Sequence, residues 1–125
     1  MTMNFNEVTT GNFKKSSKIV DEIVKHLAAI ENDTKFYSYP DPVLNHPRYK
    51  MLIEMGDKIV PYLFHHITHN GGSWTIFYLL YNITKQNPIP KEHSGNFNYA
   101  IIYWLQWFMD SDYYKNDDIY YGLHK

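Results

Sequence analysis

Residues 73–84 read SWTIFYLLYNIT, and this stretch decides the fold. Its apolar and aromatic side chains do not alternate with polar ones, so the pattern favours a helix over a half-buried strand. A helix that is apolar nearly all round is usually contacted on several sides. Ser73 is suited to cap such a helix, because its hydroxyl accepts a free amide hydrogen of the first turn. We therefore predict that residues 74–84 form a central apolar helix of an all-α protein.

Further helices are predicted on both sides of this centre, because apolar residues recur there at spacings of three and four. Their expected ranges are residues 14–31, 47–55, 58–69 and 97–110. Gly56 is expected to end the second of these helices in a left-handed conformation, and Asp57 to cap the next one. Since the connections are short, we predict about five helices in a compact bundle or a short stack of helix pairs.

The chain of 125 residues has the length of one domain. Residues 1–13 are polar and are predicted to form a flexible arm, followed by a helical domain over residues 14–110. Residues 111–125 are acidic and rich in tyrosine. This last segment is predicted to be either a frayed tail or one short docked helix.

Composition excludes several classes of function. The net charge of −1 argues against nucleic-acid binding, for which Lys14, Lys15 and Lys18 are the only basic cluster considered. The absence of Cys excludes disulfides, thiolate metal sites and a cysteine nucleophile. The longest apolar stretch, residues 100–109, is shorter than the roughly 20 residues of a membrane span, and no signal peptide is recognisable. We therefore expect a cytoplasmic protein without a membrane partner.

The segment from His46 to Phe108 carries a motif spread over its helices and loops. Its residues are His46-Pro47, Tyr49, Leu52-Ile53, Met55-Gly56, Val60-Pro61, Leu63, Trp74, Leu79, Ile83-Thr84, Asn87-Pro88-Ile89-Pro90, Gly95, Ala100, Trp104-Leu105 and Trp107. This pattern resembles a family of small prokaryotic helical proteins with HPxY, MG, IT, PxP and WLxW segments. No activity is attached to that family, so the resemblance implies a fold rather than a function.

The arrangement of Gly56, Val60-Pro61 and Leu63 is also similar to the second helix of HEAT-type repeats. Such repeats are helix pairs that stack and present a surface to partners. The resemblance implies a short HEAT-like unit rather than a long solenoid. Because fold alone does not give function, it identifies no partner.

Histidines are the candidate metal ligands. His65 and His69 are four positions apart, so they share a helix face, and His46 or His93 would have to supply a third ligand. The Glu that acts as general base in HExxH zinc enzymes is missing, because His66 follows His65. The alternative is that the histidines of the 58–69 helix lie on its solvated face, and we predict no bound metal or cofactor.

His46 is also weighed as a general base, with Tyr49 one turn away. No nucleophile or paired carboxylate is placed nearby by the sequence. The preferred interpretation is structural: the imidazole either caps the helix that begins at Pro47 or packs on the preceding loop. No catalytic residue is predicted.

Tyrosine supplies the strongest functional signal. The chain has 12 Tyr, more than a small core can bury with every hydroxyl satisfied, so some are expected at the surface. The expected interaction surface consists of Tyr37, Tyr39, Tyr113, Tyr114, Tyr120 and Tyr121. Tyrosine is enriched at binding surfaces, although an A/T-rich genome would also raise its frequency.

These observations favour a non-enzymatic helical domain that binds a protein partner or itself. One alternative is a regulatory or antitoxin-like protein encoded at a mobile-element locus. Another is a histidine-based metal-binding protein. Genes that flank this one would separate the first alternative from the leading hypothesis, and elemental analysis would test the second.

Overall fold

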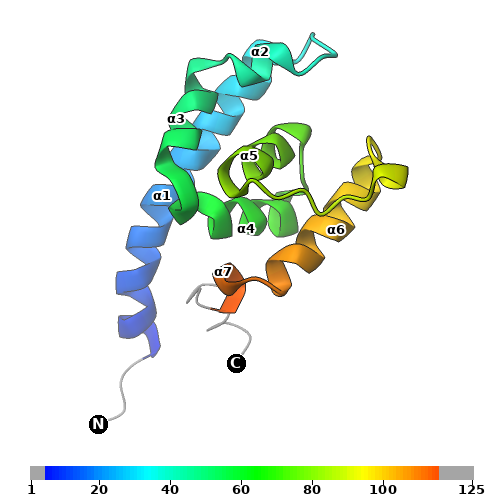
Figure 1. Ribbon diagram of the computed structural model, residues 1–125. Helices are drawn as coiled ribbons and strands as arrows, with labels where there is room; N and C mark the ends of the chain where they lie inside the picture. Colours follow the sequence, from blue (N-terminus) through cyan, green and yellow to red (C-terminus); the bar gives the residue numbers. More distant parts are fainter. Residues whose placement is uncertain (1–4, 116–125) are drawn as a thin grey trace. The chain divides into compact units, whose positions relative to one another are not determined.

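The computed structural model describes residues 5–115, and their side chains from Lys18 onward (Figure 1). Within this range every regular element is a helix, so the predicted all-α class is confirmed. The elements are α1 (Phe5–Thr34), α2 (Asp41–Leu44), α3 (Pro47–Met55), η1 (Gly56–Ile59), α4 (Val60–Asn70), α5 (Trp74–Thr84), η2 (Lys91–His93), α6 (Phe97–Met109) and α7 (Asp112–Lys115).

The chain divides into two compact units, residues 1–50 and residues 51–125. The boundary falls inside α3, where the sequence shows no linker and gives no sign of a division. None of the helices described is both long and apolar enough to cross a bilayer.

The first unit is built on α1, which contacts the short helix α2. The buried side chains of α1 are Ile23, Leu27 and Ile30, at helical spacing. The structure places residues 5–13, which the sequence assigns to a flexible arm, inside α1. A polar helix start lacks the apolar period on which the sequence prediction depends, and no proline interrupts it before Pro40.

In the second unit α4 lies beside η1, α5, α6 and α7, which it contacts (Figure 1). Phe64 of α4 is fully buried and stacks on Phe108, with ring centroids 4.3 Å apart and planes at 13°. Trp104 and Trp107 complete this aromatic cluster, at 6.2 Å and 6.1 Å from the Phe64 ring. Three aromatic rings of α6 are therefore gathered around one residue of α4.

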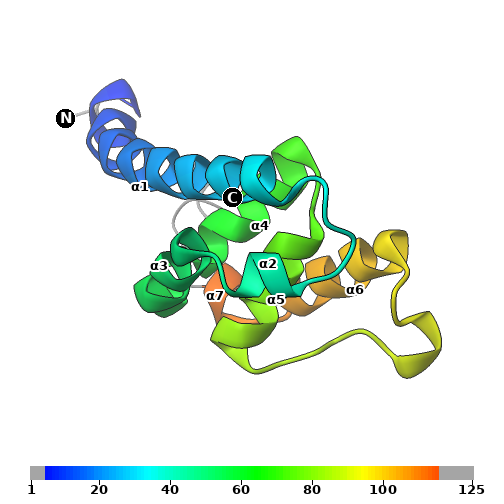
Figure 2. The same ribbon diagram turned by 90° about the horizontal axis from the view of Figure 1, so that it is seen from above.

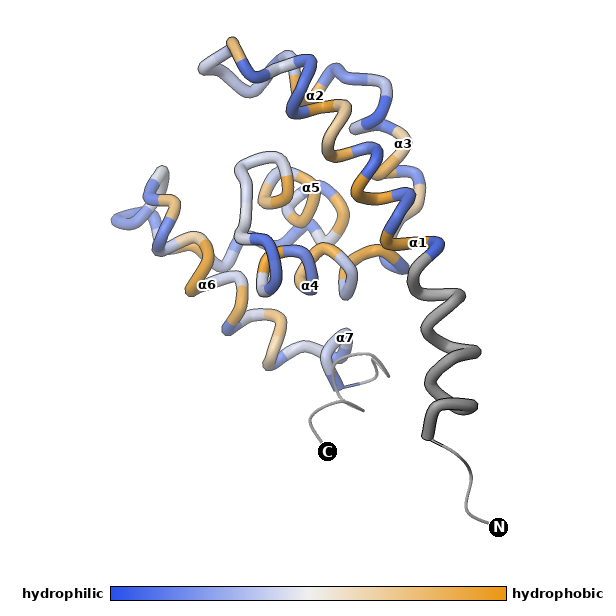
Figure 3. Tube along the Cα trace, turned by 180° about the vertical axis from the view of Figure 1, so that it is seen from behind, coloured by the Kyte–Doolittle hydropathy of each residue, from blue (hydrophilic) through white to orange (hydrophobic). Residues whose placement is uncertain are grey.

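α5 carries strongly hydrophobic residues in each of its turns, interspersed with more polar ones (Figure 3). Its buried residues are Thr75, Ile76, Phe77, Leu79 and Leu80. However, Trp74 and Tyr81 are 37% and 51% exposed, so the helix is not covered all round. These two aromatic residues, near opposite ends of α5, therefore reach the surface.

The ends of these helices agree with the sequence in part. The Ser73 hydroxyl accepts the amide hydrogen of Ile76 at 3.2 Å, and Gly56 has a positive φ of 71°. The cap expected from Asp57 is wrong, because the 3-10 turn η1 intervenes and Ile59 precedes α4 instead. Proline in the first turn of α4 has no amide hydrogen. One fewer backbone amide of that turn therefore needs a hydrogen-bond acceptor outside the helix.

α5 and α6 are joined by a long loop that contains the short 3-10 turn η2 (Figure 2). Beyond α6, the described part of the C-terminal segment is the short helix α7, which contacts both α4 and α6. The structure describes only the beginning of the segment for which the sequence predicts either a frayed tail or a short docked helix, and Asp112–Lys115 are helical there. Residues 116–125, including Tyr120 and Tyr121, lie outside the described residues.

Candidate functional site

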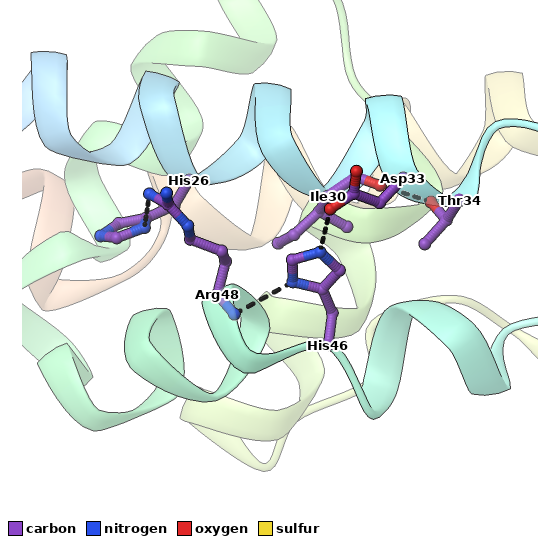
Figure 4. Close-up of polar contacts among 6 residues, drawn as sticks. All are labelled: His26, Ile30, Asp33, Thr34, His46 and Arg48. Atoms are coloured by element: carbon purple, nitrogen blue, oxygen red, sulfur yellow. Dashed lines mark hydrogen bonds and ion pairs between the residues drawn. The ribbon is translucent and has the colours of Figure 1, made fainter.

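His46 caps α3 with its side chain (Figure 4). The backbone amide of Arg48 donates to His46 Nδ1 at 3.0 Å. Because Nδ1 accepts, the hydrogen of the neutral ring lies on Nε2, which donates to Asp33 Oδ2 at 2.8 Å. The His46 side chain is only 12% exposed. Both ring nitrogens are thus occupied by structural hydrogen bonds, and neither is free to act as a base.

A second polar contact lies beside it. Arg48 Nη1 donates to His26 Nδ1 at 3.3 Å, so α1 is tied to the first turn of α3 at two points (Figure 4). Tyr49, considered as a partner of His46, is buried. The group around His46 therefore links α1 to the beginning of α3.

His65 and His69 lie together on α4, as their spacing predicts. Their rings stack with centroids 4.0 Å apart, and His69 Nδ1 donates to the His65 carbonyl oxygen at 3.0 Å. His69 is exposed, but His65 and His66 are half-buried, which differs from the solvated face expected for them. The Nδ1 atom of His66 is buried without a hydrogen-bond partner.

The other candidate ligand, His93, is engaged elsewhere. Its ring stacks on Tyr99 at 3.8 Å, with Tyr103 next in line at 5.8 Å. Among the residues whose side chains are described, no group of three or more His, Asp or Glu is arranged to hold a metal ion. The four histidines proposed as ligands thus show one pair, His65 and His69, and no complete site.

The tyrosines of the interaction surface predicted from sequence fall into two groups. Tyr37 and Tyr39 are 55% and 54% exposed, and their rings meet edge to face at 5.8 Å. Phe36 beside them is 90% exposed, with the Lys35 ammonium 5.3 Å from its ring centre. We call residues 35–39 the aromatic turn. Phe36 is absent from the surface predicted from tyrosines alone, although three aromatic residues within four positions, 36–39, indicate it.

Tyr113 and Tyr114 form the second group, and they are half-buried rather than presented to a partner. The Tyr113 hydroxyl donates to Asp57 Oδ1 at 2.8 Å, and its ring lies 5.9 Å from that of Trp107. Tyr114 meets Phe108 edge to face at 5.5 Å. These contacts hold α7 in place, so the two residues serve the fold instead of an open surface.

Burial raises the pKa of Tyr113 to about 12, and the neighbouring Asp57 adds to the shift. The hydrogen bond that the hydroxyl donates to the carboxylate favours the neutral phenol, and the carboxylate charge repels a phenolate. Tyr113 is therefore a neutral donor throughout the physiological pH range. This state fits a structural role.

The second unit also contains a pocket of about 320 Å³ beside the first turn of α5. It is lined by Trp74, Asn87, Ile89, Lys91, Ser94 and Gly95. None of these residues is acidic, and a single cation, Lys91, lies among them. Composition and periodicity could not indicate this pocket, because it forms where a loop folds back toward a helix end.

Comparisons with protein-family models, with curated proteins and with solved structures found no match to this chain. The resemblance to the prokaryotic helical family and to a HEAT-type pair therefore stays a prediction. Two surfaces of the described residues, the aromatic turn and the pocket, are candidates for a functional role.

Proposed function

We propose that this chain is a non-enzymatic protein-interaction domain whose contact surface is the aromatic turn. The observation that carries the proposal is the 90% exposure of Phe36, with Tyr37 and Tyr39 also more than half exposed. Burying a phenylalanine side chain in an interface stabilises a complex by roughly 1.5–3 kcal/mol. Aromatic side chains of this kind are enriched among the residues that dominate binding energy.

The charges around the turn favour a protein over an anionic partner. The exposed Glu31, Asp33 and Asp41 flank it in the sequence, although Asp33 also accepts the hydrogen bond from His46, whereas Lys35 is the only cation within the turn itself. A nucleic acid or an anionic membrane would meet these carboxylates with repulsion. A protein surface with an apolar pocket and a basic rim is the complementary partner.

Site-specific photocrosslinking in the native cell tests this proposal. A benzophenone amino acid would replace Phe36, and a matched chain would carry it at Glu22, an exposed position of α1 in the same unit. We expect a protein adduct of defined mass at position 36 and none at position 22. An adduct at twice the 15.0 kDa chain mass would identify self-association, and a larger or smaller increment a different protein.

Specificity is checked by replacing Tyr37 and Tyr39 with serine in the chain that carries the crosslinker. The adduct should weaken, because the remaining contact area is smaller. Adducts of equal yield at positions 36 and 22, or adducts with lipid alone, would contradict the proposal. A thermal melt of the Phe36→Ser variant should match the parent, since an exposed side chain contributes about 0.5 kcal/mol or less to stability.

A further inference from the structure

The pocket beside α5 has two kinds of wall. Among its lining residues, Trp74 and Ile89 have apolar side chains, while Lys91 carries an ammonium group and Ser94 a hydroxyl. Its volume of about 320 Å³ lies at the small end of the range for pockets that bind small molecules, about 300–1,000 Å³. The walls therefore suit a compact ligand with an apolar body and one anionic group.

The loop wall of this pocket is held in one conformation by local contacts. Asn87 Oδ1 accepts the amide hydrogen of Ile89 at 3.1 Å, and the amide of Ser94 donates to the Lys91 carbonyl oxygen at 3.1 Å. Pro88 and Pro90 restrict the backbone between these two turns. A loop fixed in this way loses little conformational freedom when a ligand binds.

Both sides of the pocket are also braced by aromatic contacts. His93, which lies between the lining residues Lys91 and Ser94, stacks on Tyr99 of α6. The Trp74 ring meets Phe77 and Phe97 edge to face, with centroids 5.7 Å and 5.6 Å away. The indole is thus positioned by its neighbours while it remains 37% exposed. The pocket is formed before any ligand arrives.

We propose that this pocket binds a small aromatic carboxylate. The ring of the ligand would lie against Trp74 and Ile89, where offset or edge-to-face aromatic contact is favourable. Its carboxylate would pair with the Lys91 ammonium and accept a hydrogen bond from the Ser94 hydroxyl. With no acidic residue in the lining, a cationic ligand finds no carboxylate partner there. This inference is independent of the aromatic turn.

Titration with phenylacetate, followed through the indole Nε1–H signals of the nitrogen–proton correlation spectrum, tests the proposal. The Trp74→Phe variant assigns the Trp74 signal among those of the 3 Trp in the chain. We expect saturable shifts of that signal with a dissociation constant of about 1 mM or tighter, because one exposed ion pair and one aromatic contact give a weak complex. The buried Trp104 serves as an internal reference that should not shift.

Two comparisons test the chemistry. Lys91→Met should weaken phenylacetate binding about two- to fivefold, whereas Lys58→Met, which removes an exposed lysine outside the pocket, should not. Phenylacetamide, the neutral analogue, should bind as weakly to the parent as phenylacetate binds to Lys91→Met. The proposal is overturned if phenylacetate produces no saturable shift at Trp74, or if the amide and the acid bind equally well.

Discussion

At position 46 a histidine takes the place that serine, threonine or aspartate usually takes at a helix start. Its Nδ1 accepts the Arg48 amide hydrogen, and its Nε2 bonds to Asp33. The two interactions differ in energy. A cap contributes about 0.5–2 kcal/mol, whereas the hydrogen bond from the neutral imidazole to the exposed Asp33 carboxylate is weakened by competing solvent. Most of the stabilisation at His46 should therefore come from the cap.

Substitutions at position 46 test this assignment by chemical denaturation. His46→Ala should lower the free energy of unfolding by about 1 kcal/mol, because it removes the cap and leaves the Arg48 amide without an acceptor. His46→Asn should retain most of the stability, since asparagine is a good cap that cannot reach as far. An equal loss in both variants would mean that the contact with Asp33 carries the energy.

Tyr113 should make the free energy of unfolding change with pH in the alkaline range. Its pKa in the folded chain, about 12, lies above the ordinary value of 10.0, so folding favours the neutral phenol. This contribution is fully present below pH 10 and is lost as the pH rises through about 12. We expect the free energy of unfolding to fall less steeply between pH 10 and 12 in Tyr113→Phe than in the parent. Parallel pH profiles for the two chains would rule out this coupling.

At the scale of the element, two helices end at a residue with a left-handed backbone conformation. This residue is a glycine at one end and a lysine at the other. Gly56 has a φ of 71°, and a Cβ added there would meet no atom within 4 Å. Lys85 ends α5 with a φ of 61°, where a side chain crowds its own backbone. Position 56 therefore has glycine, the residue that a left-handed conformation favours, and position 85 does not.

Removing the glycine at position 56 and introducing one at position 85 should change the free energy of unfolding in opposite directions. Gly56→Ala should lower the free energy of unfolding by about 1 kcal/mol through backbone strain alone. Lys85→Gly should raise it by up to about 1 kcal/mol, because glycine adopts the left-handed conformation without that strain. Urea denaturation of both variants measures the two effects, and a loss of stability in Lys85→Gly would show that the lysine side chain makes a compensating contact.

At the scale of the whole molecule, phenylalanine occurs in two extreme environments. Phe64 is fully buried in the aromatic cluster of the second unit, and Phe36 is 90% exposed in the first. Truncating a buried phenylalanine removes its transfer energy and leaves a cavity, whereas truncating an exposed one does neither. The same substitution should therefore have very different consequences at the two positions.

Phe64→Ala should lower the free energy of unfolding by about 3–5 kcal/mol, and Phe36→Ala by about 0.5 kcal/mol or less. Guanidinium denaturation followed by circular dichroism measures both. Phe64→Leu, which keeps most of the volume, should fall between them. A small effect of Phe64→Ala would show that the rings of Trp104 and Phe108 close the cavity.

Local patterns in the chain were sufficient to predict the all-α class, the bounds of α3, α5 and α6 to within a residue or two, and the Ser73 cap. Each of these depends on residues at most a few positions apart, through helical periodicity or a hydrogen bond to the next turn. The start of α1 and the 3-10 turn before α4 escaped prediction, because neither has an apolar period of its own.

The roles of individual side chains were decided only by tertiary structure. The half-buried Tyr113 donates its hydroxyl hydrogen to Asp57, 56 positions earlier, so a residue expected at a binding surface became a contact within the fold. Trp74 forms a pocket wall only because residues 87–95 fold back beside it. Helices form through interactions between residues that are close in sequence. Whether an aromatic ring is buried in the core, packed at the edge of a site or exposed depends on which distant segment covers it.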